Sequence, residues 1–150
     1  MTTVFTIGYE QATSGAVLDE LARAKVEVLV DVRAVAASRR PGFSKRQLAA
    51  GLDEHGIGYL HLQGLGTPKE GRLAARSGDA KTMLRIYDKH LKTPKAREEL
   101  DELTSLVKSG RRVCLLCYER DPRQCHRTRI GELLCERTGA RIDDLIPALI

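Results

Sequence analysis

The amino-acid sequence predicts an α/β protein: a single three-layer α/β/α domain over residues 1–150, with a small, mostly parallel sheet of four or five strands. Short apolar runs alternate along the chain with segments of helical periodicity, which is the pattern of βαβ units. The 150 residues suffice for one hydrophobic core but are too few for two comfortable ones. Hydrophobic residues make up 42% of the chain, and no linker, repeat or low-complexity segment divides it.

The first half of the chain is expected to supply three strands and two helices. Strands are expected where apolar and β-branched residues run together, and helices where apolar residues recur every three or four positions. In chain order these are a strand at residues 3–7, a helix at 14–24, a strand at 26–32, a helix at 44–55 and a strand at 57–62. The nearly continuous apolar run at 26–32 is typical of a strand covered on both faces, as in a parallel sheet.

The second half begins with a polar, irregular stretch at residues 67–78, which is expected to form a mobile loop. Two helices follow it, and they are separated at Thr93-Pro94 because proline disrupts a helix interior. The remaining elements are expected to be helices at 79–91 and 94–108, a strand at 113–116, a helix at 124–137 and a last short strand at 142–145. Gly139 is expected to end the last helix, since glycine favours the left-handed conformation found there.

The chemistry is expected around residues 113–127, whose sequence is VCLLCYERDPRQCHR. An apolar strand runs into a charged turn and then into a helix. Asp121 is a suitable helix cap, Pro122 suits the first helical position, and Gln124 follows three residues after the cap. The free N–H groups and the dipole at such a helix start favour negative charge. The segment therefore predicts an anion-binding crevice.

Parallel sheets bind their ligands beyond the carboxyl ends of the strands. This rule brings most of the ionisable residues that adjoin the predicted strands to one rim. The residues gathered there are Tyr9, Glu10, Asp31, Arg33, His61, Cys117 and Glu119, with Cys125, His126 and Arg127 from the last helix.

Five short motifs lie at or near this rim: TIGYE, DVR, SRRPGFSK, GIGYLHLQGLG and CYERDPRQCHR. Their combination resembles the bacterial family known as domain of unknown function 488. The resemblance covers nearly the whole chain, and the set of motifs is specific although each motif alone is weak. It implies a small cytoplasmic α/β protein with these motifs around one site. It implies no reaction, so the individual residues are assessed by their chemistry.

Four residues are the candidates for catalysis: Cys117, Glu119, Cys125 and His126. His126 lies four residues before Ile130 and continues the apolar stripe of the predicted helix, so its side chain is expected to face the sheet. A satisfied core histidine would give the same pattern. Cys125 is expected in the first turn of the helix, beside cationic side chains, where the thiolate is favoured.

The four cysteines, Cys114, Cys117, Cys125 and Cys135, all lie in the last third of the chain. A disulfide framework would instead span the whole fold. We therefore expect free thiols and a reducing cytoplasm. Cys114 and Cys135 are expected to be packing residues.

Ligand binding is assigned first to an anion clamp made of Arg33, Arg39 and Arg127, because an arginine fork matches phosphate and carboxylate oxygens. Arg39 belongs to the basic loop before the second helix, which also contains the binding candidates Ser38, Phe43 and Ser44. The alternative interpretation of this loop is a solvated charged surface. Asp31 is expected either to form a structural ion pair with Arg33, Arg39 or Arg127, or to orient an arginine or His126. The remaining binding candidates are Tyr9, Glu10 and His61.

Two further interpretations of the cysteine motif are disfavoured. Cys117 and Arg123 have the C-x5-R spacing of cysteine phosphatases, and DVR with this motif faintly resembles rhodanese domains. However, Glu119 and Asp121 would repel a dianion, and Pro122 lacks an N–H group. The spacing of Cys114 and Cys117 would suit a zinc knuckle, but on a strand their thiols point to opposite faces. No metal and no cofactor are expected.

The chain carries 25 Lys and Arg against 20 Asp and Glu, for a net charge of +5. This balance permits an acidic partner, and we expect an enzyme that acts on or binds a small anionic ligand, phosphate-bearing or nucleotide-like. The alternative is a nucleic-acid-binding or accessory protein without catalysis, but the basic residues are dispersed, so only weak, non-specific binding of nucleic acid is expected. No apolar run is long enough for a membrane span, and the N-terminus lacks the features of a signal peptide, which favours a cytoplasmic location.

Overall fold

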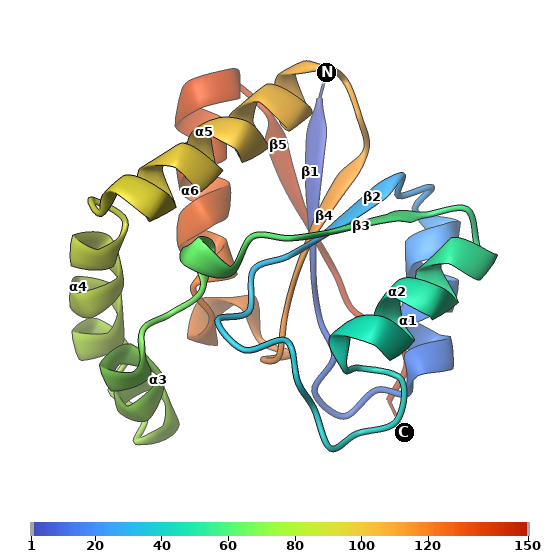
Figure 1. Ribbon diagram of the computed structural model, residues 1–150, viewed down its shortest axis with the longest axis horizontal. Helices are drawn as coiled ribbons and strands as arrows, with labels where there is room; N and C mark the ends of the chain where they lie inside the picture. The colour runs from blue at the N-terminus through green and yellow to red at the C-terminus, as the bar shows by residue number, and fades with distance from the viewer. Residues whose placement is uncertain (1, 150) are drawn as a thin grey trace.

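A five-stranded, entirely parallel sheet forms the centre of the computed structural model, which describes residues 2–149 apart from the side chain of Gln124 (Figure 1). The strands are β1 (Thr3–Gly8), β2 (Val28–Asp31), β3 (Gly58–His61), β4 (Val113–Cys117) and β5 (Arg141–Leu145). They lie in the order β3-β2-β4-β1-β5, so β4 and β1 are buried between neighbours. The predicted α/β class and parallel sheet are confirmed.

Helices cover both faces of the sheet and make three layers (Figure 1). Helices α1 (Ser14–Arg23) and α2 (Lys45–Glu54) pack on one face. The other face carries α3 (Lys69–Arg76), α4 (Ala80–His90), α5 (Pro94–Lys108) and α6 (Arg127–Thr138), and two short 3-10 turns, η1 (Gln63–Leu65) and η2 (Pro122–Gln124), precede α3 and α6. Within the described residues, no helix combines the length and apolar character that crossing a bilayer requires.

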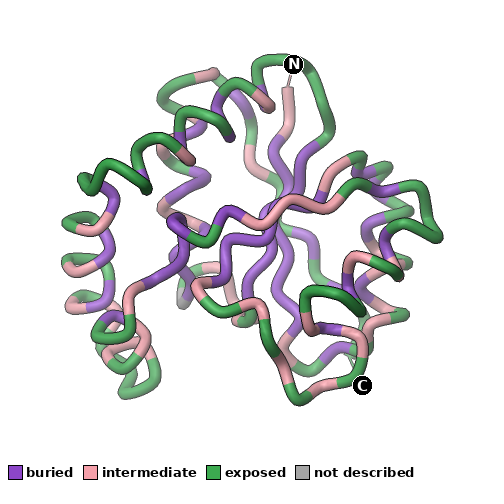
Figure 2. Tube along the Cα trace, in the orientation of Figure 1, coloured by how far each residue is buried: buried purple, intermediate pink, exposed green. Residues whose placement is uncertain are grey.

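The central strands β1, β2 and β4 are largely apolar and buried because helices cover both of their faces (Figure 2). The edge strand β5 has the sequence RIDDL and instead exposes Arg141, Asp143 and Asp144. Successive side chains of β4 alternate between the two cores. Val113, Leu115 and Cys117 lie in the core beneath the α4–α6 layer, whereas Cys114 and Leu116 lie beneath α1 and α2. As the sequence predicts, Cys114 and Cys117 therefore point to opposite faces of the sheet.

The expected loop at residues 67–78 is wrong, because this stretch contains helix α3. The residues that anchor α3 are small, and they give only a weak apolar periodicity. Gly71 is buried against α4, where a Cβ atom would lie 2.5 Å from Thr67 Cγ2 and 3.5 Å from Ile86 Cγ2. Ala74 and Ala75 pack on the core beside it. Charged residues occupy most of the other positions, and they give the segment its loop-like composition.

The last helix begins later than the expected residue 124. Asp121 does act as a cap, but for the 3-10 turn η2, where its carboxylate accepts the N–H of Arg123 at 2.9 Å. Cys125 is then extended, and α6 begins only at Arg127. Cys125 is therefore not in the first turn of the helix as predicted. Gly139 ends α6 with φ of +74°, in the left-handed conformation that the sequence predicts.

Candidate functional site

A cavity of about 790 Å³ opens at the carboxyl ends of β1, β2 and β4. Its wall includes seven of the sequence-predicted site residues: Tyr9, Glu10, Arg33, Cys117, Glu119, Cys125 and His126. Further lining comes from Ala34, Val35, Ala37, Thr67, Arg72, Ala75, Arg76, Met83 and Tyr118. The volume lies within the range of small-molecule sites, and the wall mixes apolar, aromatic and charged groups as such sites do.

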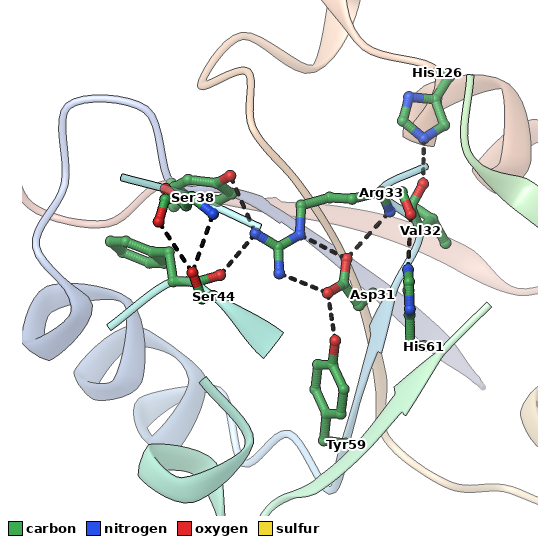
Figure 3. A network of polar contacts seen from close by, with 10 residues as sticks. Asp31, Val32, Arg33, Ser38, Ser44, Tyr59, His61 and His126 are labelled. Carbon is green, nitrogen blue, oxygen red and sulfur yellow. Dashed lines mark hydrogen bonds and ion pairs between the residues drawn. The ribbon is translucent and has the colours of Figure 1, made fainter. Parts of the chain in front are cut away.

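Asp31 and Arg33 form a buried ion pair at the end of β2 (Figure 3). Arg33 Nε donates to Asp31 Oδ1 at 2.9 Å and Nη2 donates to Oδ2 at 2.7 Å, while the hydroxyl of Tyr59 donates to Oδ2 at 2.6 Å. Burial acts to lower the pKa of Arg33, but the hydrogen bond and charge of Asp31 outweigh it and raise the pKa. Of the partners that the sequence left open for Asp31, Arg33 is the one that the structure gives.

The guanidinium of Arg33 also fixes the chain around it. Its Nη1 donates to the carbonyl of Phe43 at 2.8 Å and to the hydroxyl of Tyr9 at 3.2 Å. The rings of Tyr9 and Phe43 stack with their centroids 4.4 Å apart. Arg33 therefore reaches the cavity with its charge balanced by Asp31 and most of its donors engaged.

The loop before α2 is closed by two serines rather than opened toward a ligand (Figure 3). Ser38 N–H donates to Ser44 Oγ at 3.1 Å, and Ser44 Oγ donates to the Ser38 carbonyl at 3.0 Å. Arg39 is exposed and does not line the cavity. Its neighbour Arg40 turns inward instead, and donates to the carbonyls of Tyr9, at 2.7 Å, and Ala12.

His126 lies buried on the cavity wall, with its ring oriented by β2 (Figure 3). Its Nε2 lies 2.7 Å from the carbonyl of Val32, which can only accept, so Nε2 carries the hydrogen and Nδ1 a free lone pair. Nδ1 is 3.7 Å from Cys125 Sγ. Burial lowers the pKa of His126 to about 4, so the ring is neutral at physiological pH. The expectation that His126 faces the sheet at this edge is confirmed.

His61 lies behind the wall, at the end of β3, and does not line the cavity. Its Nε2 contacts the carbonyl of Arg33 at 2.8 Å (Figure 3). His61 therefore supports the segment that carries Arg33.

Cys117 and Cys125 are joined by a disulfide bond, which corrects the expectation of four free thiols. The extended conformation of Cys125 turns its side chain back toward the end of β4, a placement that a helical Cys125 would not have. Cys114 and Cys135 are free. Complete burial raises the pKa of the Cys114 thiol, in agreement with a packing role.

Arg127 is fully buried behind the disulfide and does not line the cavity. Its Nη1 donates to the carbonyl of Glu119 at 2.5 Å and contacts Cys117 Sγ at 3.0 Å, and Nη2 donates to the carbonyl of Arg120 at 3.3 Å. Within the described part of the chain it has no carboxylate partner, and its Nε has no hydrogen-bond partner. Burial lowers the pKa of Arg127.

The first N–H groups of α6 are directed at the chain itself rather than at an anion in the cavity. The N–H of Arg127 is directed at Cys125 Sγ at 3.5 Å, and those of Thr128 and Arg129 donate to the carbonyls of Cys125 and His126. Arg123, the arginine of the C-x5-R spacing, has a side chain that is 85% exposed and pairs with Asp121. The phosphatase-like arrangement is therefore not formed.

Glu119 and Glu10 place two carboxyl groups in the cavity wall. Partial burial raises the pKa of Glu119, and the charge of Glu10 adds to this effect, while Arg127 and Arg76 oppose it. The carboxylate of Glu10 accepts the N–H of Arg120 at 3.0 Å. The raised pKa brings protonation of Glu119 closer to neutral pH, as an acid–base group requires.

Nine residues of the wall lie outside the sequence-predicted set, and three of them have charged or aromatic side chains suited to ligand binding: Arg72, Arg76 and Tyr118. The two arginines are one turn apart on α3, and Tyr118 follows β4 with its side chain 45% exposed. The four-residue spacing of Arg72 and Arg76 is the signal that could have found them, but only if the segment had been recognised as a helix.

Cys117, Cys125 and His126 also form the cluster of potential metal-binding groups that the described residues contain, with their donor atoms within 4.8 Å of one another. The two sulfurs are bonded to each other, so they present a disulfide rather than two thiolate ligands. We assign no metal to them.

The chain was compared with known proteins. No curated protein and no solved structure matches it. The model of one protein family, described as Domain of unknown function DUF488, matches residues 14–134. This match covers most of the chain and all the cavity-lining residues except Tyr9 and Glu10. The chain therefore belongs to the DUF488 family.

Proposed function

We propose that the cavity at the carboxyl ends of the strands binds a small anionic ligand, phosphate-bearing or nucleotide-like, and that the protein acts on it as an enzyme. The observation that carries this proposal is the pair of arginines, Arg72 and Arg76, in the wall of a cavity of about 790 Å³. Arg33 is neutralised by Asp31, whereas no carboxylate pairs with either α3 arginine in the described part of the chain. These two residues supply the positive charge that an anion requires.

The aromatic residues of the wall suit the remainder of a nucleotide-like ligand. Tyr118 is 45% exposed, and its ring meets that of Tyr9 at an angle of 81° with centroids 5.4 Å apart. An exposed ring held in this way offers a face on which a base can stack. A ligand with both a phosphate group and a planar ring would contact the arginines and an aromatic residue of the same cavity wall.

Glu119 is the proposed acid–base residue. Its raised pKa makes proton uptake and release possible closer to neutral pH than for an exposed glutamate. Arg76 lines the same cavity as Glu119, so the proposed phosphate-binding and proton-transfer groups share one site.

Isothermal titration of the protein with adenosine monophosphate, inorganic phosphate and adenosine tests the binding step. We expect the monophosphate to bind more tightly than either component. The Arg72→Ala/Arg76→Ala variant should weaken its binding by at least about tenfold. The Arg46→Ala/Arg97→Ala variant is the matched control, because it removes the same charge from exposed positions on α2 and α5. Equal losses in both variants, or binding unaffected in both, would contradict the proposed site.

A further inference from the structure

We propose that Cys117 and Cys125 form a redox-active pair that exchanges disulfide bonds with a small, negatively charged thiol bound in the cavity. Both residues line the cavity, so a ligand held there lies against the disulfide. The anionic character of the thiol rests on the function proposed above, whereas the exchange step does not depend on it.

Arg127 favours Cys117 as the leaving group when a thiol attacks the disulfide. Its guanidinium is fully buried and has no ion-pair partner in the described part of the chain, and a buried charge without a counter-ion is costly. Nη1 already lies 3.0 Å from Cys117 Sγ, and Nε has no partner among the described residues. Opening the disulfide would create a thiolate at Cys117 and give this cation the counter-charge that the oxidised protein lacks. Glu119 Oε2 lies 3.5 Å from the same sulfur; its carboxylate would oppose the thiolate, whereas its neutral acid, favoured by the raised pKa, would donate a hydrogen bond to it.

His126 gives the second sulfur a different environment. Its Nδ1 lone pair faces Cys125 Sγ at 3.7 Å, because Nε2–H is held by the Val32 carbonyl. A neutral imidazole in this orientation accepts a hydrogen bond from a Cys125 thiol. The reduced pair is therefore asymmetric, with a thiolate at Cys117 beside Arg127 and a protonated thiol at Cys125 beside His126.

The exchange proceeds in two displacements. The first thiol enters as its thiolate and attacks Cys125 Sγ. A bond forms between these sulfurs, the bond between Cys117 and Cys125 breaks, and its electron pair remains on Cys117 as the thiolate. A second thiol attacks the ligand sulfur of the mixed disulfide, and Cys125 leaves and takes up the proton of that thiol. Two thiols are oxidised to one disulfide, the protein disulfide is reduced to a thiol and a thiolate, and one proton passes to solvent.

Peptide mapping by mass spectrometry tests the pair itself. Protein oxidised with glutathione disulfide is unfolded, alkylated with iodoacetamide and digested. We expect a peptide linked through Cys117 and Cys125, with Cys114 and Cys135 alkylated. Brief treatment of the oxidised protein with glutathione and quenching in acid should then give glutathione on Cys125. Alkylation of all four cysteines after oxidation, or glutathione on Cys117 alone, would overturn the proposal.

Alkylation of the reduced, folded protein tests the roles of the neighbours. At mildly acidic pH, Cys117 should react about tenfold faster than Cys135. Arg127→Gln should abolish this advantage, whereas Arg129→Gln, which removes a charge on the exposed side of α6, should preserve it. If Arg127→Gln does not fold, the pH dependence of the Cys117 alkylation rate in the unaltered protein tests the assignment. Cys117 reacting no faster than Cys135 would contradict the assignment.

Comparison of two thiols separates this proposal from the preceding one. Arg72→Ala/Arg76→Ala should slow reduction by glutathione, which carries carboxylates, but not reduction by the neutral 2-mercaptoethanol. If the variant and the unaltered protein are reduced at the same rate by glutathione, and likewise by 2-mercaptoethanol, disulfide exchange would be supported and a preference for an anionic thiol refuted. Absence of the Cys117–Cys125 link would refute exchange and leave the nucleotide titrations unaffected.

Discussion

The backbone of Gly8 packs directly against the backbone of Glu119, so that a Cβ atom on Gly8 would overlap the carbonyl group of Glu119. The same carbonyl accepts the hydrogen bond from Arg127. This close approach joins the end of β1 to the turn after β4, the turn that carries Glu119 into the cavity wall.

Gly8→Ala should therefore lower the free energy of unfolding by about 3 kcal/mol, since backbone atoms on both sides must move to admit a methyl group. Urea denaturation followed by circular dichroism measures it. Gly15→Ala is the matched control, because the nearest atom to a Cβ at that helical position is 3.9 Å away. A Gly8→Ala protein as stable as the Gly15→Ala protein would show that the end of β1 and the turn after β4 are not in contact.

Asp31→Ala should lower the free energy of unfolding by about 3–5 kcal/mol, because it leaves the Arg33 guanidinium buried without its counter-ion. Tyr59→Phe removes one hydrogen bond to the carboxylate and should cost about 1–2 kcal/mol. Asp101→Ala breaks an exposed pair with Arg137 and should have little effect. The three variants can be compared by urea denaturation at neutral pH. An Asp31→Ala protein no less stable than the Asp101→Ala protein would be inconsistent with a buried pair.

Stability should fall as the pH is lowered from neutrality, in part because of His126. Its pKa is about 4 in the folded protein, against the ordinary value of 6.5. Burial is the first cause, and Arg127 and His90 act in the same direction, while the Val32 carbonyl and Asp31 oppose it. Between these pH values the unfolded chain binds a proton that the folded protein does not. This contribution is therefore fully present above pH 6.5 and is lost as the pH falls toward 4, at a cost on the order of 2–3 kcal/mol.

The pH dependence of urea denaturation in the His126→Gln protein isolates this contribution. The slope of stability against pH in this range should decrease in His126→Gln. His55→Gln, a histidine substitution at an exposed position, is the matched control. Equal slopes in all three proteins would show that His126 titrates normally.

Binding of sulfate, whose own charge is constant over the range used, should strengthen as the pH falls through the raised pKa of Glu119. The carboxylate repels an anion in the cavity, and the neutral acid does not. Glu119→Gln should bind sulfate at neutral pH nearly as well as the unaltered protein does at low pH, with a flatter profile. Isothermal titration across pH measures both. Weaker binding by Glu119→Gln at neutral pH would contradict this electrostatic account.

The strands and the rim are predictable from the sequence because they follow from simple patterns. Helices cover both faces of the central strands β1, β2 and β4, so these strands are largely apolar runs. Residues after those runs, such as Tyr9, Arg33 and Glu119, meet at one edge of the sheet. Asp31 and Arg33 are two residues apart in the sequence, so Arg33 could be predicted as one of the possible ion-pair partners of Asp31, and it is the partner in the structure.

Other features depend on interactions that the sequence does not display. The signals at Asp121 and Pro122 suit a 3-10 turn as well as an α-helix, so the turn η2 and the extended Cys125 were missed. The bond between Cys117 and Cys125 follows from that local geometry. Helix α3 relies on Gly71 and on small alanines, and the two arginines that it brings to the cavity were overlooked with it.

The location of the ligand site is the central claim, and mapping of amide chemical shifts by NMR during titration with adenosine monophosphate tests it most directly. The account predicts that shifts change along α3 and in the segments that follow β1, β2 and β4, and that the Arg72→Ala/Arg76→Ala protein loses these changes. Changes confined to the exposed basic residues of α2 or α5, or equal changes in the Arg72→Ala/Arg76→Ala protein, would contradict it.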